Sequence, residues 1–253
     1  MKRFIIIITL FTLFLNCASA SVYKTVTKDY KVVTADKFTM TARLEYPKVK
    51  GATNYKTVVL LHSLGYNSDW WMTLPQMLLD KGYAVLLIDL RGHGNSVFNS
   101  KLSQSSWSSL TNSAYAKYPD DVLAVIDYVK NENKRTFFNE WAIVGSDIGA
   151  STAVFVANKI QNKPKTIVML SPVVKAKGLY IPVKLAEVND VDILSIIGKN
   201  DMSSHKANHY LKKFAQSTYV EYISDAKSTG MLMLKLDDTL SNVITSWISQ
   251  YLN

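Results

Sequence analysis

The chain has 253 residues, of which 48% are hydrophobic and 19% charged, so it suits one large folded domain and is not an intrinsically disordered chain. The formal net charge is +9, but the basic residues are scattered along the sequence, which favours an ordinary basic surface over the clustered charge of nucleic-acid-binding proteins, so no nucleic-acid partner is predicted. The single cysteine, Cys17, excludes an intramolecular disulfide, and no run after residue 20 is apolar and long enough to form a transmembrane helix.

The first twenty residues have the three parts of a secretory signal peptide. Lys2 and Arg3 make a basic start, residues 4–15 are apolar apart from threonine, and small residues precede a cleavage point after Ala20. The sequence therefore predicts a signal peptide over residues 1–20 and a folded domain over residues 21–253. We expect an exported, periplasmic protein of a bacterium. An alternative is a lipoprotein anchored through Cys17, although Asn16 is a poor match to the small residue usual before such a cysteine.

The first part of the mature chain is predicted to form an antiparallel hairpin. Residues 30–34 and 38–44 are two β-rich runs, with residues 35–37 between them. In the second run the apolar residues alternate with polar ones, which is typical of a strand with one buried face.

Apolar strands then alternate with helices along the rest of the chain. We expect buried strands at residues 57–61, 83–90, 141–144, 166–170, 192–197 and 219–223. Helical spacing indicates helices at residues 68–82, with a bend at Pro75, and at 120–130, 150–160, 206–215 and 240–252. This order predicts a mostly parallel sheet flanked by helices on both faces, with the ligand crevice at the carboxyl ends of the strands.

Four motifs lie at those strand ends: HSLG at residues 62–65, DLRGHGNS at 89–96, GSDIG at 145–149 and IGKND at 197–201. Together and in this order they resemble the α/β-hydrolase fold, in particular its small serine esterases and lipases. The resemblance runs from about Lys31 to the C-terminus. It implies a single α/β-hydrolase domain, and residues 171–190 are too few for the large helical cap that some members insert there.

The resemblance also assigns roles to particular positions. It places Asp147 at the nucleophile position, Asp201 at the acid position and Lys227 at the base position, where the family has serine, an acid and histidine. Ser146 lies one residue too early to be the nucleophile, and no histidine follows His209. The backbone amides of Leu64 and Ile148 are the implied oxyanion hole.

Two altered triad positions argue against catalysis. Dehalogenases and epoxide hydrolases of this fold use an aspartate nucleophile, but a histidine then activates water. A lysine between two carboxylates stays charged and cannot take up that proton. We therefore expect an inactive protein in which Asp147, Lys227 and Asp201 form an ion cluster. The negative charge of Asp147 favours a neutral or cationic small-molecule ligand in the former active-site cleft.

Two other functions stay open at this stage. The chain could be an active hydrolase of carboxylic esters or related bonds, using Asp147, Ser146 or Ser228, or an interaction or scaffold protein of the cell envelope. No cofactor is predicted. No metal site is predicted either, because His205 and His209, four residues apart, lack a third ligand. His62 and His93 are interpreted as hydrogen-bonded loop histidines. The oligomeric state is not predicted.

Overall fold

The structure is a computed structural model that describes residues 23–52, 54–99 and 103–252. The predicted signal peptide, Cys17 and the predicted cleavage point lie outside these residues. Within them, no helix has the length and apolar character needed to cross a bilayer.

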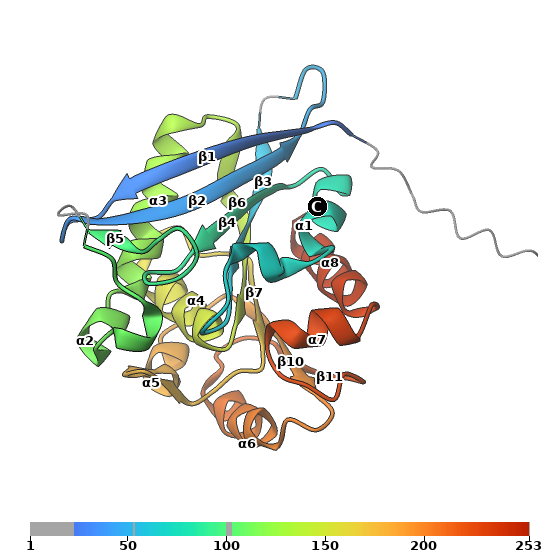
Figure 1. Cartoon of the computed structure of the whole chain (residues 1–253). Coiled ribbons are helices and arrows are strands. Elements are labelled where there is room, and N and C mark those ends of the chain that lie inside the picture. Colours follow the sequence, from blue (N-terminus) through green and yellow to red (C-terminus); the bar gives the residue numbers. More distant parts are fainter. Residues whose placement is uncertain (1–22, 53, 100–102, 253) are drawn as a thin grey trace, which may run out of the picture.

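One mixed sheet forms the centre of the molecule (Figure 1). Eight of its strands follow one another in the order β1-β2-β4-β3-β6-β7-β10-β11, and β5 pairs with β2. The six strands from β4 to β11 are parallel, whereas β2 is antiparallel to both β1 and β4. The strands are β1 (Thr25–Val33), β2 (Phe38–Pro47), β3 (Tyr55–Leu61), β4 (Ala84–Asp89), β5 (Phe98–Asn99), β6 (Thr136–Ser146), β7 (Thr166–Leu170), β10 (Asp192–Gly198) and β11 (Tyr219–Ser224). The predicted hairpin and mostly parallel sheet are confirmed.

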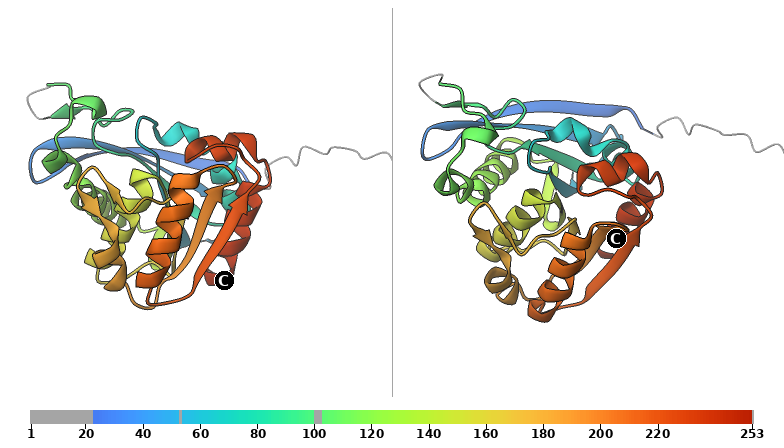
Figure 2. Two further views of the ribbon diagram at one scale, coloured as in Figure 1. Left: turned by 90° about the horizontal axis from the view of Figure 1, so that it is seen from below. Right: turned by 60° about the horizontal axis from the view of Figure 1, so that its bottom comes forward.

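Helices cover both faces of this sheet. The α-helices are α1 (Leu74–Asp80), α2 (Asn112–Tyr115), α3 (Tyr118–Glu132), α4 (Ile148–Lys159), α5 (Ile181–Ala186), α6 (Met202–Leu211), α7 (Met231–Leu236) and α8 (Leu240–Tyr251). Three short 3₁₀ helices are η1 (Ser68–Trp71), η2 (Trp107–Ser109) and η3 (Lys212–Phe214). Figure 2 shows the teal α1 beside the red α7 and α8, apart from the green α3 and yellow α4.

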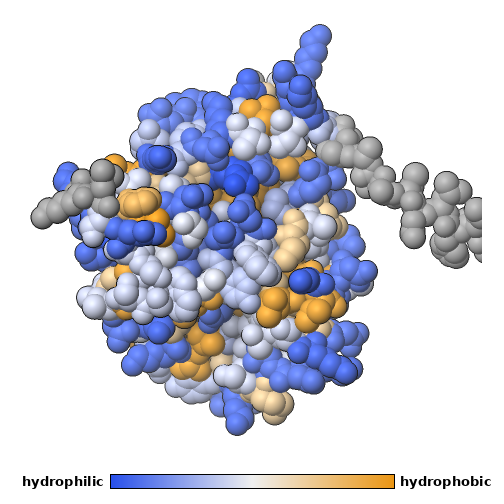
Figure 3. Space-filling model, in the orientation of Figure 1, coloured by the Kyte–Doolittle hydropathy of each residue, from blue (hydrophilic) through white to orange (hydrophobic). Residues whose placement is uncertain are grey.

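The two helical layers bury two separate apolar cores. Successive residues of β3 alternate between them: Val59 and Leu61 pack with α3, α4 and α5, while Val58 and Leu60 pack with α1, α7 and α8. A strand whose two faces are both covered by helices has a continuous run of apolar residues. This is why β3 was recognisable in the sequence. The surface in Figure 3 is mostly hydrophilic, with small apolar patches between the polar residues.

Between β7 and α6 the chain holds only small elements. A two-stranded ribbon of β8 (Lys175–Ala176) and β9 (Leu179–Tyr180) leads into the six-residue α5. The expectation that no large cap covers the sheet is confirmed.

The observed helices differ from the sequence prediction at three places. The single helix expected over residues 68–82 is instead η1 followed by α1, because Met72 between them has a φ of 52° that no helix contains. The helix expected from residue 206 begins earlier, at Met202, since the Asp201 side chain caps it. The apolar run at residues 231–236 forms α7, which the sequence analysis did not predict.

A buried ion pair ties the hairpin to the strand-end turn of residues 89–96. The Arg91 guanidinium donates to the Asp121 carboxylate at 2.6 and 2.8 Å and to Asp36, in the β1–β2 turn, at 2.9 Å. These bonds from Arg91 hold the pKa of Asp36 well below its usual range. The Arg91 and Asp121 side chains are only 6% and 3% exposed, so Asp121 without Arg91 would be an uncompensated buried charge, whereas Arg91 without Asp121 would keep its pair with Asp36.

This arrangement predicts unequal effects at two adjacent acids. Asp121→Asn should lower the free energy of unfolding by about 1.5–3 kcal/mol, because Arg91 loses charged hydrogen bonds in a buried position but keeps its pair with Asp36. The matched control is Asp120→Asn, whose partner Lys159 lies at 2.6 Å on the exposed surface. It should cost less than about 1 kcal/mol. Urea unfolding of both variants measures the difference, and equal losses would contradict a buried role for Asp121.

Candidate functional site

The sharp turn between β6 and α4 carries Asp147. This residue has φ 53° and ψ −111°, and two glycines flank it. A Cβ on Gly145 would lie 2.3 Å from the Gly149 carbonyl oxygen, and one on Gly149 would lie 2.1 Å from the Leu61 carbonyl oxygen. Only glycine fits at both positions. The turn therefore has the geometry of a nucleophile elbow, with Asp147 at its apex.

The Asp147 carboxylate lies against the loop that follows β3. Its Oδ2 accepts a long hydrogen bond of 3.4 Å from the Leu64 backbone amide. Burial raises the pKa of Asp147 above its ordinary value of 3.8; the Leu64 and Ile148 amides oppose this shift, and the Asp201 carboxylate adds to it. The Leu64 and Ile148 amides, which the resemblance assigns to an oxyanion hole, thus both stabilise the charged Asp147 carboxylate.

Asp201 is close enough to influence Asp147, and half of its carboxylate has no partner. The residue follows β10 and is 6% exposed. Oδ1 accepts from the Ser204 amide at 3.0 Å and caps α6, whereas Oδ2 is buried and accepts no hydrogen bond from the described residues. A buried acceptor without a donor is costly, so this oxygen is an atom that a donor group would stabilise.

Lys227 does not join the two carboxylates. Its side chain is exposed, and no ion pair among the described residues connects it to Asp147 or Asp201. The expected Asp147–Lys227–Asp201 ion cluster is therefore not formed. The reason lies in the loop between β11 and α7, which packs its backbone on β10: a Cβ on Gly198 would lie 1.9 Å from the Ser228 carbonyl oxygen. The loop follows that contact, and the lysine points to solvent.

The other serines near the elbow serve packing and hydrogen bonding. Ser63 donates from Oγ to the Oγ of Ser146 at 2.7 Å, and both residues are buried. Gly230 lies over this pair, since a Cβ there would be 2.8 Å from the Ser63 Oγ. Its amide donates to the Ser171 Oγ at 2.8 Å. The sequence analysis did not find the roles of Ser63 and Ser171, because only the fold brings these distant loops together.

Two of the four histidines are committed to backbone groups. His62 Nε2 accepts from the Leu90 amide at 2.9 Å, and its Nδ1 donates to the Ser63 carbonyl at 2.8 Å. His93 Nε2 accepts from the Gly65 amide at 3.0 Å, and its Nδ1 donates to the Arg91 carbonyl. Burial lowers the pKa of His62 to about 4 and also lowers the pKa of His93. Both are neutral loop histidines, and neither is free to act as a base.

The remaining histidines, His205 and His209, lie on α6, where the first is half-buried and the second exposed. Over the described residues, no group of three or more histidine, cysteine, aspartate or glutamate side chains is arranged to hold a metal ion.

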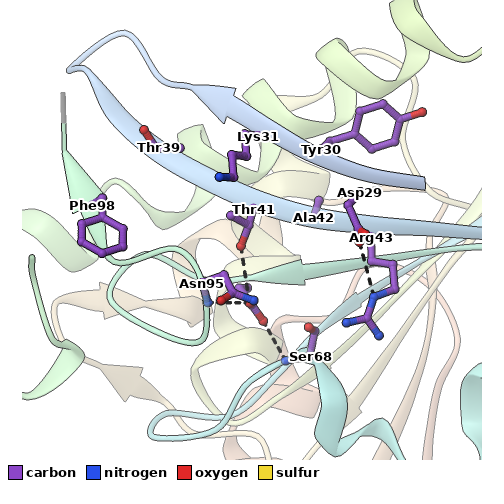
Figure 4. A pocket seen from close by; sticks show the side chains of 11 residues that line it. Asp29, Tyr30, Lys31, Thr39, Thr41, Ala42, Arg43, Ser68, Asn95 and Phe98 are labelled. Carbon is purple, nitrogen blue, oxygen red and sulfur yellow. Dashed lines mark hydrogen bonds and ion pairs between the residues drawn. The ribbon is translucent and has the colours of Figure 1, made fainter. Parts of the chain in front are cut away.

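Two hollows border the loops of the site. One of about 160 Å³ lies at the loop after Leu64, lined by Gly65, Tyr66, Trp70 and Trp107 among others. The second, of about 420 Å³, lies between the polar face of the β1–β2 hairpin and the turn that begins at Asp89 (Figure 4). The smaller hollow is below the size usual for drug-sized ligands and suits a small group.

The polar groups of the larger hollow are mostly satisfied within the chain. Its Asp89 carboxylate accepts from the amides of Ser68 and Asn95 at 2.9 and 2.8 Å. Arg43 pairs with Asp29 and with Asp69 (Figure 4 shows the first pair). These bonds shape the turn of residues 89–96 and pair Arg43 with acidic side chains, while Lys31 also lines the hollow.

Solved structures resemble this fold over almost the whole chain. An esterase of Pyrococcus furiosus superimposes with a TM-score of 0.70 at 14% identity, covering 90% of this chain and 92% of the esterase. A dienelactone hydrolase of Anabaena variabilis superimposes with a TM-score of 0.67 at 16% identity, covering 90% and 99%. Likeness at this level of identity shows the fold.

Sequence comparison adds a relative and a family. A probable lipase of Schizosaccharomyces pombe is 26% identical over 164 residues, which are 59% of this chain and 35% of the lipase. The chain thus spans about a third of the length of that relative. The family model described as serine aminopeptidase, S33, matches residues 52–227, which is more than half of the chain. The chain therefore belongs to the serine aminopeptidase (S33) family of α/β-hydrolase-fold proteins.

Proposed function

We propose that this chain is a catalytically inactive member of its family that binds a small neutral or cationic ligand at the former active site. The observation that carries the proposal is the position of the Asp147 carboxylate at the apex of the elbow, against the Leu64 amide. In an acyl-transfer enzyme those amides stabilise the oxyanion that develops in the transition state. A carboxylate beside them repels that oxyanion.

The missing base supports the same proposal. An aspartate nucleophile forms an ester that only an activated water can cleave. His62 and His93 bond to the backbone through both ring nitrogens, and Lys227 is exposed and unpaired with either carboxylate. The related lipase and esterases make an active ester hydrolase the alternative, and this arrangement weighs against it.

The ligand class follows from charge and hydrogen bonding. Asp147 and Asp201 interact with each other, and Oδ2 of Asp201 is a buried acceptor without a donor. An ammonium group provides three donors and a positive charge, so it would satisfy this atom and reduce the repulsion between the carboxylates. A neutral donor would satisfy Asp201 as well, whereas an anion would meet repulsion from both acids.

Esterase assays test the loss of catalysis. The wild type should not hydrolyse short-chain p-nitrophenyl esters above background, because the elbow lacks a serine and the loop lacks a histidine. Asp147→Ser combined with Lys227→His should stay inactive as well, because residue 227 points to solvent and a histidine there does not reach position 147 or Asp201. Clear turnover by the wild type that Asp147→Ala abolishes would sink the proposal.

Ligand titrations test the preference for cations. Butylammonium should shift the backbone amide NMR signals of Leu64 and Ile148, and sodium acetate at equal ionic strength should not. Asp147→Ala should weaken ammonium binding at least about tenfold, since a hydrogen bond to a charged group contributes about 1.5–3 kcal/mol. The control Asp127→Ala removes the same charge from the exposed face of α3 and should bind as the wild type does. Stronger binding of acetate, or unchanged binding in Asp147→Ala, would contradict the assignment.

We further propose that the protein is exported, on the strength of the signal-peptide pattern in residues 1–20. Intact mass measurement of the chain after expression in a bacterium should find a mature protein that begins at Ser21 in the soluble envelope fraction. A lipid-modified chain that begins at Cys17 would instead support a membrane-anchored form, and an unprocessed chain in the cytoplasm would contradict export.

A further inference from the structure

A hollow of about 590 Å³ opens at the edge of the sheet opposite to the elbow. Its residues come from the start of β1, the end of β2, the β2–β3 loop, the start of β3 and the segment before β6. The β2–β3 loop projects at the top of Figure 1. β3 runs from Tyr55 at this hollow to Leu61 beside the elbow, so the two ends lie roughly 20 Å apart, at about 3.3 Å per residue. The hollow is therefore separate from the former active site.

The charges around this hollow are all of one sign. Lys48, Lys50 and Arg135 line it, and no acidic side chain does so among the described residues. Lys24 lies alongside, since its carbonyl oxygen accepts from the Lys48 amide. None of these four cations forms an ion pair with a described acidic residue. The lining of this hollow therefore differs in charge from that of the hollow beside β1 and β2, which includes Asp29 and Asp89 as well as cations.

Hydrogen bonds hold Arg135 in place. Two tyrosine rings line the base of the hollow. The Arg135 Nη1 donates to the Ala52 carbonyl at 2.8 Å, and its own carbonyl accepts from the Tyr55 amide at 2.6 Å. Tyr46 and Tyr55, both buried, pack with their ring centroids 5.4 Å apart at the base of the hollow. With Nη1 committed to Ala52, the rest of the guanidinium fork stays available for a ligand.

A neighbouring hollow is also lined by basic side chains. It shares Tyr55 with the first and is lined by Lys56 and Lys81, again without an acidic side chain among the described lining residues. Lys56 is paired with Glu140 at 2.7 Å, whereas Lys81 forms no ion pair with a described acidic residue and adds a further positive charge there. The cationic surface therefore continues past the rim of the larger hollow.

We propose that the hollow lined by Lys48, Lys50 and Arg135 binds a phosphate group carried by a larger molecule. The planar guanidinium of arginine can donate two parallel hydrogen bonds to a phosphate, and the ammonium group of lysine provides a compact positive charge beside it. The volume is larger than a bare phosphate requires and leaves room for an attached polar group above the tyrosines. Such a phosphate ester can come from a phospholipid headgroup at an anionic membrane surface or from a soluble metabolite.

The test compares two triple variants of the full chain that change the net charge equally. Lys48→Gln, Lys50→Gln and Arg135→Gln neutralise the hollow, and Lys206→Gln, Lys212→Gln and Lys213→Gln neutralise exposed positions on α6 and η3. All variants keep residues 1–20, so any contribution of that segment is constant. Thermal unfolding checks that each variant folds, and the pair Lys48→Gln and Lys50→Gln alone keeps the Arg135 bond to Ala52.

Two probes distinguish the two sources of phosphate. Titration with glycerol 1-phosphate measures binding of a soluble ester, and sedimentation with phosphatidylcholine vesicles, with and without phosphatidylglycerol, measures binding to headgroups. Neutralising the hollow should weaken binding of the effective probe by about a hundredfold, given the usual contribution of each basic residue at an anionic surface. The α6–η3 variant should bind as the wild type does. Absence of binding to both probes, or equal loss in the two triple variants, would overturn the proposal.

Discussion

Gly149, in the first turn of α4, lies directly against the end of β3, where a Cβ would be 2.1 Å from the Leu61 carbonyl oxygen. This close approach fixes the path of the chain from β6 into α4 and forces Asp147 into a backbone conformation that few residues adopt. β3 and β6 are neighbours in the centre of the sheet. The packing of the central helix, the direction of the Asp147 side chain and the position of the Leu64 loop all depend on this contact.

The close approach of Gly149 to β3 fixes the backbone of the elbow. It does not depend on which side chain stands at position 147. Aspartate tolerates unusual backbone angles better than most residues, and a carboxylate at the N-terminus of α4 is favoured by the helix dipole. The elbow can therefore persist after its serine is gone. In this chain the amides that would face a reacting oxygen act on a permanent carboxylate instead. The fold keeps the geometry of an enzyme, and we propose that it uses this geometry for binding.

Much of the architecture was predictable because it depends on local patterns. Strands buried on both faces give continuous apolar runs, so β7 was predicted with its observed bounds. The strand-end motifs identified the elbow because steric demands require glycine at 145 and 149. Alternation along the second run of the hairpin predicted the start of β2 at Phe38 and its buried face, although β2 extends beyond the predicted end, to Pro47.

Other features depend on contacts that no local pattern reveals. The direction of Lys227 is set by the packing of its loop on Gly198, and the sequence motif indicates only its position in the chain. The hydrogen bond between Ser63 and Ser146 joins residues 83 positions apart. The cationic hollow likewise combines the β2–β3 loop with Arg135, so scattered basic residues in the sequence become a local concentration of charge in space.

The central claim is that the Asp147 carboxylate takes the place of a substrate oxygen at the Leu64 and Ile148 amides. An NMR titration that follows the Asp147 carboxyl carbon together with these two amides tests it most directly. The carboxyl should titrate with a pKa above its ordinary value of 3.8, because burial disfavours the charged form. Both amide signals should move with the same midpoint, and these movements should vanish in Asp147→Asn. An ordinary or lowered pKa, with amides that do not respond, would contradict the account.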